Sequence, residues 1–536
     1  MRLVSIAIFA ILAFVLLGTV SGCNGEGSSV GQTASTSIDP PVEPEPPGDQ
    51  PGFPFVDHLD QAAVTGGSVG FDELFIIGDE LFETQFTALD GVGALLLPDE
   101  TPLPSRFSRV PPGGGRFTGP NGQACNGCHN APFGTSAGTA SSNVVQDPAL
   151  AGSPPFNLRN TISLFGSGMV QRLAEEMTED LLRTRDQAAA LATPGGPGVT
   201  PLLVSKGVSF GSITVSRDAG GAVTFDTSAV EGVSPDLVVR AFGWKGDVPT
   251  IREFARGAAR NELGMEADEL VEKDSLDRSD PDGDGVEGEF SVGDITGITI
   301  YIAAQESPTT IARMVDQNFL SPPGGNFELA RQEGAVLFGL IGCDTCHVPE
   351  MHLLNPLFEE PTSRGGGNFF DDQMDPVATS LDPASPFRFH LGQQGDFPRP
   401  RAHPSGGLRV PLFGDLKRHD MGSELADAQE QPVVRADGSP LEVDAVPQTV
   451  ATSVFLTPEL WGVGNTGPWL HDGRAATLED AILLHGADDP PAVGDPGRSE
   501  AQEERDAFAA LSAEEREAVV TFLRSLILFQ VPEEEE

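Results

Sequence analysis

The stretch Cys125-Asn-Gly-Cys128-His129 returns later in the chain as Cys343-Asp-Thr-Cys346-His347, and this pair decides what fold we expect. Both are C-x-x-C-H motifs, in which two thiols three positions apart can reach the two vinyl groups on one edge of a haem. The histidine that follows then lies under the iron and supplies an axial nitrogen. A zinc site would need four convergent ligands, and a redox dithiol would not need the histidine. The motifs therefore predict two covalently bound c-type haems.

An internal repeat surrounds the two motifs. Each is preceded by a G-x-x-L-F segment, at Gly78–Phe82 and Gly334–Phe338, which resembles the first helix of small class I cytochromes c. Each is followed by an echo of the form T-x-x-L-[FW]-G-x-G, at Thr161–Gly168 and Thr457–Gly464. We therefore expect a mainly α protein made of two class I cytochrome c-like haem domains with long loops and a small β-hairpin insertion.

The domain boundaries follow from these two copies. We expect an N-terminal haem domain over residues 61–205 and a C-terminal haem domain over residues 326–536. Residues 206–325 form the connecting region between them. Within it, the alternating stretch Val208–Phe225 predicts a β-hairpin.

The composition is strongly acidic. The 536 residues include 79 Asp and Glu against 32 Lys and Arg, which gives a formal charge of −47. Such a surface repels the phosphates of nucleic acid and of anionic lipid, so we expect neither as a partner. It favours a partner that carries a basic patch. Four of the five cysteines belong to the two motifs, so a disulfide framework is not expected.

The chain begins with a predicted export signal. Arg2 precedes an almost unbroken apolar run, Leu3–Leu17, which is too short for a comfortable transmembrane span. Small residues then lead to Val20-Ser-Gly-Cys23, which resembles a bacterial lipobox. We expect residues 1–22 to be a lipoprotein signal peptide and Cys23 to be the lipidated residue. An ordinary secretory signal with an incidental cysteine is the alternative.

A Pro/Gly/Glu-rich tether is predicted over residues 23–60, because this composition can bury little apolar area. The residue after the lipidated cysteine is Asn24, which is compatible with transfer to the outer membrane. We therefore expect an exported, periplasm-facing protein that meets the membrane only through its lipid anchor.

Two helices are predicted near the C-terminus. Thr477 is a candidate N-cap, and Leu478, Ile482 and His485 then fall on one apolar helical face. A histidine on such a face is either a core residue or, in a haem domain, a sixth ligand. A capping box at Ser512 starts the second helix, which we expect to pack on the helix before the second motif.

Other side chains are candidates for contact with a haem. Trp244 lies in a tight F-G-W-K turn and is either a core residue or an electron relay. His471 and His419 are alternatives to His485 as the iron ligand. Arg474 could pair with a haem propionate, or else form a surface salt bridge.

A calcium site is predicted between the two haem copies. Asp280, Asp282 and Asp284 alternate before a glycine, as at the opening of a calcium loop. The twelfth position is Ser291 rather than Glu, so the loop is not a full EF-hand. An acidic surface turn is the alternative. The residues that could complete the site are Glu287, Glu289 and Asp294.

These features together resemble a known group, the bacterial di-haem oxidoreductase family. Its members are described as thiol oxidoreductases or peroxidases and are related to the di-haem cytochrome c peroxidases. The resemblance covers most of the mature chain. The segments that carry it are Phe242–Lys245, Asp282–Gly285, Leu416–Gly422, Thr457–Gly462 and Leu470–Arg474, the last running on to His485.

The resemblance implies a division of labour between the haems. The C-terminal haem would be six-coordinate and pass electrons, the N-terminal haem would open to peroxide, and calcium would lie between them. His485 stands fourteen residues after His471, where the related peroxidases carry a ligand, and this implies ligation of the second iron by His347 and His485. For the iron at His129 we expect an open or labile site. Met169 is either its sixth ligand or a core residue.

Two functions follow from these predictions. In the first, the protein is a peroxidase-like enzyme that binds peroxide at the His129 iron, with Trp244 as a relay. A small redox protein of cytochrome or cupredoxin type would then be the electron donor. In the second, it is a non-catalytic, membrane-tethered di-haem electron carrier, in which neither iron needs an open position.

Overall fold

The computed structural model describes eleven stretches of the chain. They are residues 58–92, 108–109, 117–118, 122–138, 143–146, 156–271, 286–362, 386–393, 398–433, 441–443 and 445–531. Cys23, the tether up to residue 57 and the predicted calcium ligands Asp280, Asp282 and Asp284 lie outside the described residues. No helix of the described residues is long and apolar enough to cross a membrane.

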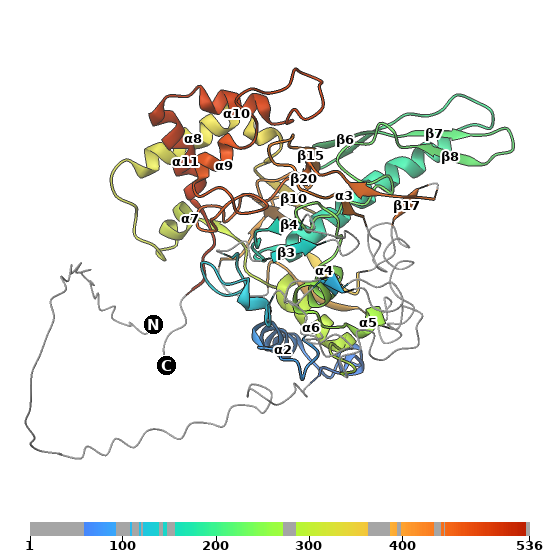
Figure 1. Ribbon diagram of the computed structural model, residues 1–536, viewed down its shortest axis with the longest axis vertical. Helices are drawn as coiled ribbons and strands as arrows, with labels where there is room; N and C mark the ends of the chain where they lie inside the picture. The colour runs from blue at the N-terminus through green and yellow to red at the C-terminus, as the bar shows by residue number, and fades with distance from the viewer. Residues whose placement is uncertain are drawn as a thin grey trace, which may run out of the picture. The chain divides into compact units, whose positions relative to one another are not determined.

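The prediction of a mainly α fold is wrong. Eleven α-helices in the described residues are accompanied by twenty-one short strands, which form ten small sheets (Figure 1). Nine sheets have two strands, and the tenth has three, in the order β10-β14-β13. The physical reason is that long connections must still satisfy their backbone hydrogen-bonding groups, and here they do so by pairing locally into short ladders. The helical periodicity around the motifs said nothing about these connections.

The helices and strands have the following bounds. The helices are α1 Gln61–Thr65, α2 Phe71–Glu83, α3 Ser167–Leu191, α4 Ile251–Ala258, α5 Asp268–Val271, α6 Val292–Ala303, α7 Ile311–Asp316, α8 Phe327–Leu340, α9 Leu478–Leu483, α10 Gln502–Ala509 and α11 Ala513–Arg524. The strands of the first half are β1 Ser108–Arg109, β2 Phe117–Thr118, β3 Asn143–Gln146, β4 Phe156–Arg159, β5 Leu202–Ser205, β6 Val208–Ser212, β7 Thr214–Arg217, β8 Val223–Asp226 and β9 Thr309–Thr310. Those of the second half are β10 Met351–Leu353, β11 Leu357–Glu360, β12 Phe387–His390, β13 Arg401–Ala402, β14 Leu408–Val410, β15 Arg418–Asp420, β16 Gln431–Pro432, β17 Glu442–Val443, β18 Val446–Pro447, β19 Thr449–Val450, β20 Val454–Leu456 and β21 Leu526–Ile527.

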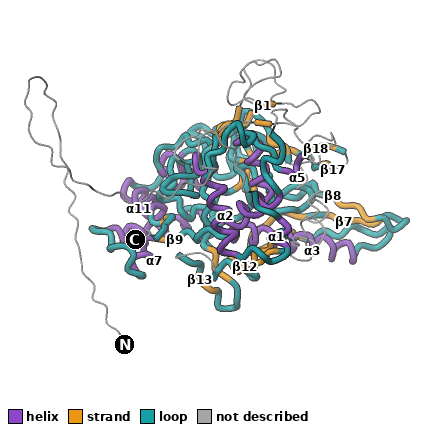
Figure 2. The backbone as a smooth tube through the Cα atoms, turned by 90° about the horizontal axis from the view of Figure 1, so that it is seen from below, coloured by secondary structure: helices purple, strands orange, loops and turns teal. Residues whose placement is uncertain are grey.

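The predicted hairpin is present as β7 and β8. The two strands pair antiparallel, with Val215 opposite Phe225, and a second hairpin of β5 and β6 precedes them. Figure 2 shows β7 and β8 extending outward beside α3.

Each haem-attachment motif follows a helix that is crossed closely by a later helix. In the first copy, a Cβ atom added at Gly78 of α2 would lie 2.3 Å from the carbonyl oxygen of Gly297 in α6. In the second copy, a Cβ at Gly334 of α8 would lie 1.9 Å from the carbonyl oxygen of Ala518 in α11. Only glycine permits such contacts between two helix backbones. The predicted packing of the C-terminal helix on the helix before the second motif is therefore confirmed (Figure 1).

The two crossings share one register. Both crossing helices begin with a capping box, built on Ser291 in α6 and on Ser512 in α11. Gly297 and Ala518, at the crossing points, each lie six residues after that cap. The last glycine of each echo segment packs on the end of the same crossing helix. A Cβ added at Gly168 would meet the carbonyl group of Ala303 at the end of α6. A Cβ added at Gly464 would meet the carbonyl group of Arg524 at the end of α11. The sequence repeat is thus also a structural repeat.

The buried apolar residues form two main clusters. The larger runs from Leu59 to Trp461 and includes residues of all three predicted regions of the mature chain. The smaller lies under α8, α9 and α11 and contains Phe338, Leu478 and Phe522. Between the copies, β9 pairs antiparallel with β21, so the chain segments that follow α6 and α11 lie side by side. The boundaries at 205 and 325 stay predictions.

Candidate functional site

The first motif lies on a short helical turn, Cys125–Gly127, after which the chain presents His129. The imidazole of His129 is half-buried, and its Nδ1 donates to the carbonyl oxygen of Ser136 at 3.1 Å. Burial lowers the pKa of His129 to about 4, so the ring is neutral at physiological pH. A neutral imidazole with Nδ1 held by a carbonyl offers Nε2 as the axial nitrogen. The Phe82 ring of α2 lies 5.9 Å away between ring centroids.

The second motif repeats this arrangement. The turn Cys343–Thr345 presents His347, whose Nδ1 donates to the carbonyl oxygen of Phe413 at 3.1 Å. Burial lowers the pKa of His347 to about 4 as well, and Phe338 of α8 lies 6.4 Å from its ring. Both proximal histidines are therefore oriented by a main-chain carbonyl and backed by a phenylalanine from the preceding helix.

The leading cysteine of each motif is a poor nucleophile. Burial raises the pKa of both Cys125 and Cys343 to about 12, so both are protonated thiols. The four motif cysteines are not joined by disulfides. Reactive dithiols and zinc ligands depend on accessible thiolate character. This environment favours sulfurs that are consumed in thioether bonds.

A cavity of about 460 Å³ opens beside the second motif, and His347 and His485 both line it. Its volume lies within the roughly 300–1,000 Å³ of typical cofactor pockets. Thr477 caps α9, as predicted, and Leu478 is buried on the inward face. His485 follows just after this helix and donates from Nδ1 to the carbonyl oxygen of Ala481 at 2.8 Å. Its Nε2 is thus also the nitrogen left for a metal.

The spacing of the two imidazoles fits one iron between them. The ring centroids of His347 and His485 are 6.5 Å apart. When two imidazoles bind one metal from opposite sides, each metal–nitrogen bond is about 2 Å long. Adding the distance from each nitrogen to its ring centre gives about 6 Å between the two ring centroids. Burial also lowers the pKa of His485, which keeps its ring neutral and able to bind metal. The residues present therefore fit a bis-histidine haem.

The alternative ligands are engaged elsewhere. His471 is 4 % exposed, with Nε2 3.4 Å from Oδ1 of Asp427, and its ring stacks on Phe455 at 4.3 Å. His419 lies 2.8 Å from both Asp415 and Glu500. Burial lowers the pKa of His419, but these hydrogen bonds to carboxylates outweigh burial and raise it to about 11. Both ring nitrogens of His419 are thus engaged by carboxylates, whereas His485 keeps Nε2 for a metal.

Arg474 occupies a surface position. It donates to Oδ2 of Asp472 at 2.6 Å and to the carbonyl oxygen of Glu424 at 2.7 Å. Arg474 is not among the described residues that line the cavity, and its salt bridge to Asp472 is present, while a contact with a haem propionate stays a prediction.

Trp244 connects the cavity to the first copy. Its Nε1 donates to the carbonyl oxygen of Asn160 at 2.8 Å, and both residues line the cavity. Two positions further on, Ile162 also lines the cavity, and its main chain lies near the ring of His129. One wall of the cavity beside His347 is therefore continuous with the surroundings of His129.

Sequence reasoning missed a buried charged cluster centred on Asp427. Asp427 lies 2.7 Å from Arg159 and 3.1 Å from Lys245, besides its contact with His471. The Nζ of Lys245 lies 3.6 Å from the centre of the Phe455 ring. Lys245 belongs to the F-G-W-K turn that drew attention to Trp244, but no sequence signal pointed to Asp427.

A second residue that sequence reasoning missed is Glu459, which lines the cavity. Burial raises the pKa of Glu459 to about 7, so its carboxyl group can exchange a proton near neutral pH. It belongs to the second echo segment, where it was noted only as part of the repeat.

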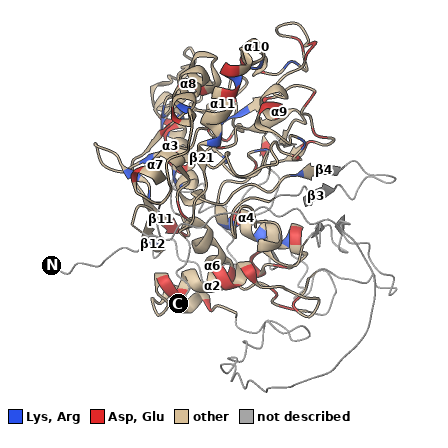
Figure 3. Ribbon diagram, turned by 90° about the vertical axis from the view of Figure 1, so that its left-hand side faces the viewer, with Lys and Arg blue, Asp and Glu red and all other residues tan. Residues whose placement is uncertain are grey.

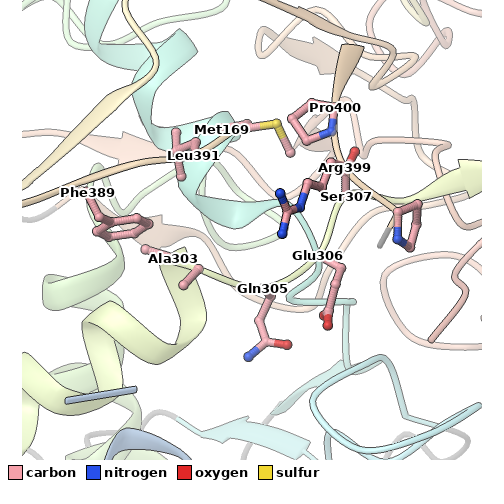
Figure 4. Close-up of a pocket in the computed structure, with 11 residues that line it drawn as sticks. Met169, Ala303, Gln305, Glu306, Ser307, Phe389, Leu391, Arg399 and Pro400 are labelled. Carbon is pink, nitrogen blue, oxygen red and sulfur yellow. The ribbon is translucent and has the colours of Figure 1, made fainter. Parts of the chain in front are cut away.

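Met169 is a buried residue of α3 and lines a small separate pocket. Figure 4 shows its side chain near Leu391 and Pro400, with Gln305 and Arg399 on the other walls. No residue of either haem-attachment motif is among the described residues that line this pocket. This surrounding favours Met169 as a core residue.

Two of the residues that could complete the calcium site have other partners. Asp294 is fully buried at the start of α6, where its carboxylate accepts from the backbone N–H groups of Leu59 and Ser291. It also lies 2.7 Å from Nδ1 of His58. Glu289 is buried and accepts from the backbone N–H of Glu266 at 2.8 Å.

Residues 406–526 match a protein family described as "Di-haem oxidoreductase, putative peroxidase". The matched stretch contains His485, the L-H-D-G-R segment beside the cavity, and α11, but neither C-x-x-C-H motif. The resemblance noted in the sequence is thus confirmed in this stretch.

No curated protein matches the chain. Two solved structures are similar to it in the comparison of folds. Hydrazine synthase of Kuenenia stuttgartiensis shares 15 % identity at a TM-score of 0.31, with 94 % of this chain and 100 % of that chain covered. A MauG-like protein associated with microbial copper homeostasis shares 16 % identity at a TM-score of 0.26, with 58 % and 78 % covered.

Proposed function

We propose that this protein is an exported di-haem c-type oxidoreductase that reduces peroxide at the first motif with electrons delivered through the second. The observation that carries the proposal is the difference between the surroundings of the two proximal histidines. His347 faces a second imidazole, that of His485, across the cavity. Within the described residues, the His129 ring contacts Phe82 and the carbonyl oxygen of Ser136, and no ring contact pairs it with a second histidine. A closed ligand pair suits electron transfer, whereas a site without one can open to a small oxidant.

Covalently bound haem would supply one-electron chemistry at both motifs and peroxide chemistry at the first. The chain's own residues hold and tune it. The carbonyls of Ser136 and Phe413 fix the tautomer and orientation of His129 and His347, which raises the basicity of each axial nitrogen. His485 closes the second site and keeps water from that position.

Trp244 is the proposed relay between the two sites. Its ring borders the cavity of the second motif, and its hydrogen bond to Asn160 leads into the strand end that approaches His129. Asp427 holds His471 and Lys245 around the same wall, which fixes the Trp244 turn in place.

Further parts of the proposal rest on the sequence. Cys23 would carry the lipid that anchors the protein on the periplasmic side of a membrane. Asp280, Asp282 and Asp284 would bind calcium in the segment that joins the copies. The electron donor would be a small redox protein of cytochrome or cupredoxin type, and the acidic surface supports a donor with a basic patch.

A non-catalytic electron carrier is the second candidate, and the like surroundings of His129 and His347, each held by a main-chain carbonyl, favour it. The test is made on the mature protein from a host that can attach c-type haem. Its mass should exceed that of the polypeptide by two haems, and it should consume peroxide when a reduced donor is supplied. A two-haem protein that does not consume peroxide would be a carrier. A protein with fewer than two haems would contradict both candidates.

A further inference from the structure

The outer face of α8 carries an exposed apolar stripe. Leu329 is 68 % exposed, Val336 63 % and Leu340 75 %. They are seven and then four residues apart, which places them on one face of the helix. The opposite face of α8 carries Gly334 and Phe338 and is packed on α11. Exposed apolar side chains gathered on one helix face indicate an interaction surface.

The first copy provides an internal comparison, because α2 and α8 have the same register. Leu329 lies five residues before Gly334, and the residue five before Gly78 is Glu73. Val336 lies two residues after Gly334, and the residue two after Gly78 is Glu80. Both glutamates are exposed. The same positions that carry carboxylates beside the first motif therefore carry apolar side chains beside the second.

The stripe leads directly to the second motif. Leu340 ends α8, and the haem-attachment turn begins at Cys343. Thr345, between the two cysteines, is exposed, so the cysteine edge of the site reaches the surface at the end of the stripe. A protein bound on the stripe would lie next to this edge.

Acidic residues surround the stripe. Glu333 is exposed on α8, and Asp344 lies within the motif itself. Glu504 of α10 approaches the turn closely, because a Cβ at Gly342 would lie 3.2 Å from its Cγ. The basic residues at this end are paired: Arg331 with Glu328, and Arg505 with Asp488 and Asp506. Figure 3 shows further acidic positions, in red, along α10.

We infer that the outer face of α8 is the docking surface for the electron donor, and that this donor is a small redox protein whose exposed redox edge is apolar and ringed by lysines. The inference rests on the proposed function and assigns the entry point of its electrons to the second copy. The apolar centre provides close contact at the edge of the haem site, and the acidic rim steers a basic partner toward it. The chain's charge of −47 extends this attraction over the longer range.

The test compares two neutral substitutions on the two-haem protein. The first variant carries Leu329→Gln and Val336→Gln, which remove two of the three apolar side chains of the stripe without changing the charge or the helix propensity greatly. The matched control is Ile76→Gln on α2, because Ile76 is 57 % exposed on the corresponding helix of the first copy. The probe is a reduced basic c-type cytochrome, and the measurement is the rate at which it reduces this protein in stopped-flow absorbance. Dithionite, which needs no docking surface, is the small reductant.

The stripe variant should need about tenfold more cytochrome to reach the same rate, as expected for loss of a small apolar hot spot. Its reduction by dithionite should be unchanged, and Ile76→Gln should behave as the wild type. Glu333→Lys should also slow the reaction, and its rate should depend less on salt.

Wild-type rates with the cytochrome in the stripe variant, or equal losses in Ile76→Gln, would overturn the inference. The outcome is independent of catalysis, since only reduction of the protein is measured. If peroxide turnover with dithionite is absent while the stripe variant still loses cytochrome reactivity, the proposed function fails and the docking surface stands.

Discussion

Among single residues, the three histidines of the two haem sites matter most, because the hydrogen bond of each ring decides which nitrogen is left for iron. His129, His347 and His485 each use Nδ1 to donate to a main-chain carbonyl, and burial lowers the pKa of all three. Each is therefore a neutral imidazole with Nε2 directed away from its hydrogen-bond partner. His419 is the opposite case, because two carboxylates hold it as a cation.

Replacing His485 tests the ligand pair. His485→Ala should leave the second haem covalently attached through Cys343 and Cys346 but convert it from low spin to high spin, because a strong-field ligand is lost. His485→Met should stay low-spin and raise the potential of that haem. The control is His471→Gln, which removes an imidazole of the same cavity wall that is hydrogen-bonded to Asp427. Unchanged optical and magnetic spectra in His485→Ala, or a spin change in His471→Gln, would show that the ligand is misassigned.

The His419 cluster predicts a pH dependence of stability. The pKa of His419 in the folded protein, about 11, lies above the value of about 6.5 for an unfolded histidine. Its stabilising effect is therefore fully present below about pH 6.5 and is lost progressively as the pH rises toward 11. We expect the free energy of unfolding in urea to fall over this range, and to fall less steeply in His419→Gln. An identical slope in the variant would mean that the carboxylates of Asp415 and Glu500 do not hold a charged imidazole.

At the scale of elements, two close helix crossings position the motifs. Gly334 allows α8 to touch the backbone of α11 at Ala518, and the Phe338 ring of the same helix then reaches His347. Gly334→Ala should destabilise the protein by about 1–3 kcal/mol or more, since the added methyl group has no space. Gly257→Ala in α4 is the matched control. No atom lies within 4 Å of its added Cβ, so it should be neutral or stabilising by up to about 1 kcal/mol.

Urea unfolding of both glycine variants makes this measurement. Equal stabilities of Gly334→Ala and the wild type would show that α8 and α11 do not cross as described. A lower stability of Gly257→Ala would show instead that α4 does not tolerate alanine for another reason.

The elements also show where sequence reasoning succeeds and fails. The helices after Thr477 and Ser512 were predictable, because caps and apolar spacing are local signals that the structure uses unchanged. The short strands were not, because segments of two to five residues carry almost no periodicity and form only when a distant partner arrives. β15 and β20, for example, pair residues 418–420 with 454–456.

The same limit applies to the candidate site. The cap at Thr477 was predictable from a local signal, but α9 ends at Leu483, so His485 follows the helix instead of lying on its apolar face, and its role as a ligand stays a prediction. Asp427 was not predictable, because its contacts with Arg159 and Lys245 form only in the tertiary structure.

At the scale of the whole molecule, Trp244 links the two copies. Trp244→Phe should slow electron transfer between the haems, because the hydrogen bond to Asn160 is lost while the ring volume is largely kept. The cost in stability should be about 1–3 kcal/mol for a buried carbonyl left unpaired. Trp469→Phe is the matched control. Trp469 lines the same cavity and loses a similar bond to Val463, but that bond stays within the second copy.

The two tryptophan variants are compared by flash reduction of the second haem, followed by absorbance changes at the first. Slower transfer in Trp244→Phe alone supports the relay. Equal rates in Trp244→Phe and the wild type would remove Trp244 from the electron path, and equal slowing in both variants would indicate a general loosening of the cavity.

The central claim is that one chain holds two haems with unlike axial coordination, closed at His347 and open at His129. The most direct measurement is the low-temperature electron paramagnetic resonance spectrum of the oxidised, intact protein. The account predicts one low-spin ferric signal of bis-histidine type and one high-spin signal of equal amount, the latter changing when peroxide is added. Two low-spin signals that peroxide leaves unaltered would contradict it and would make the protein an electron carrier.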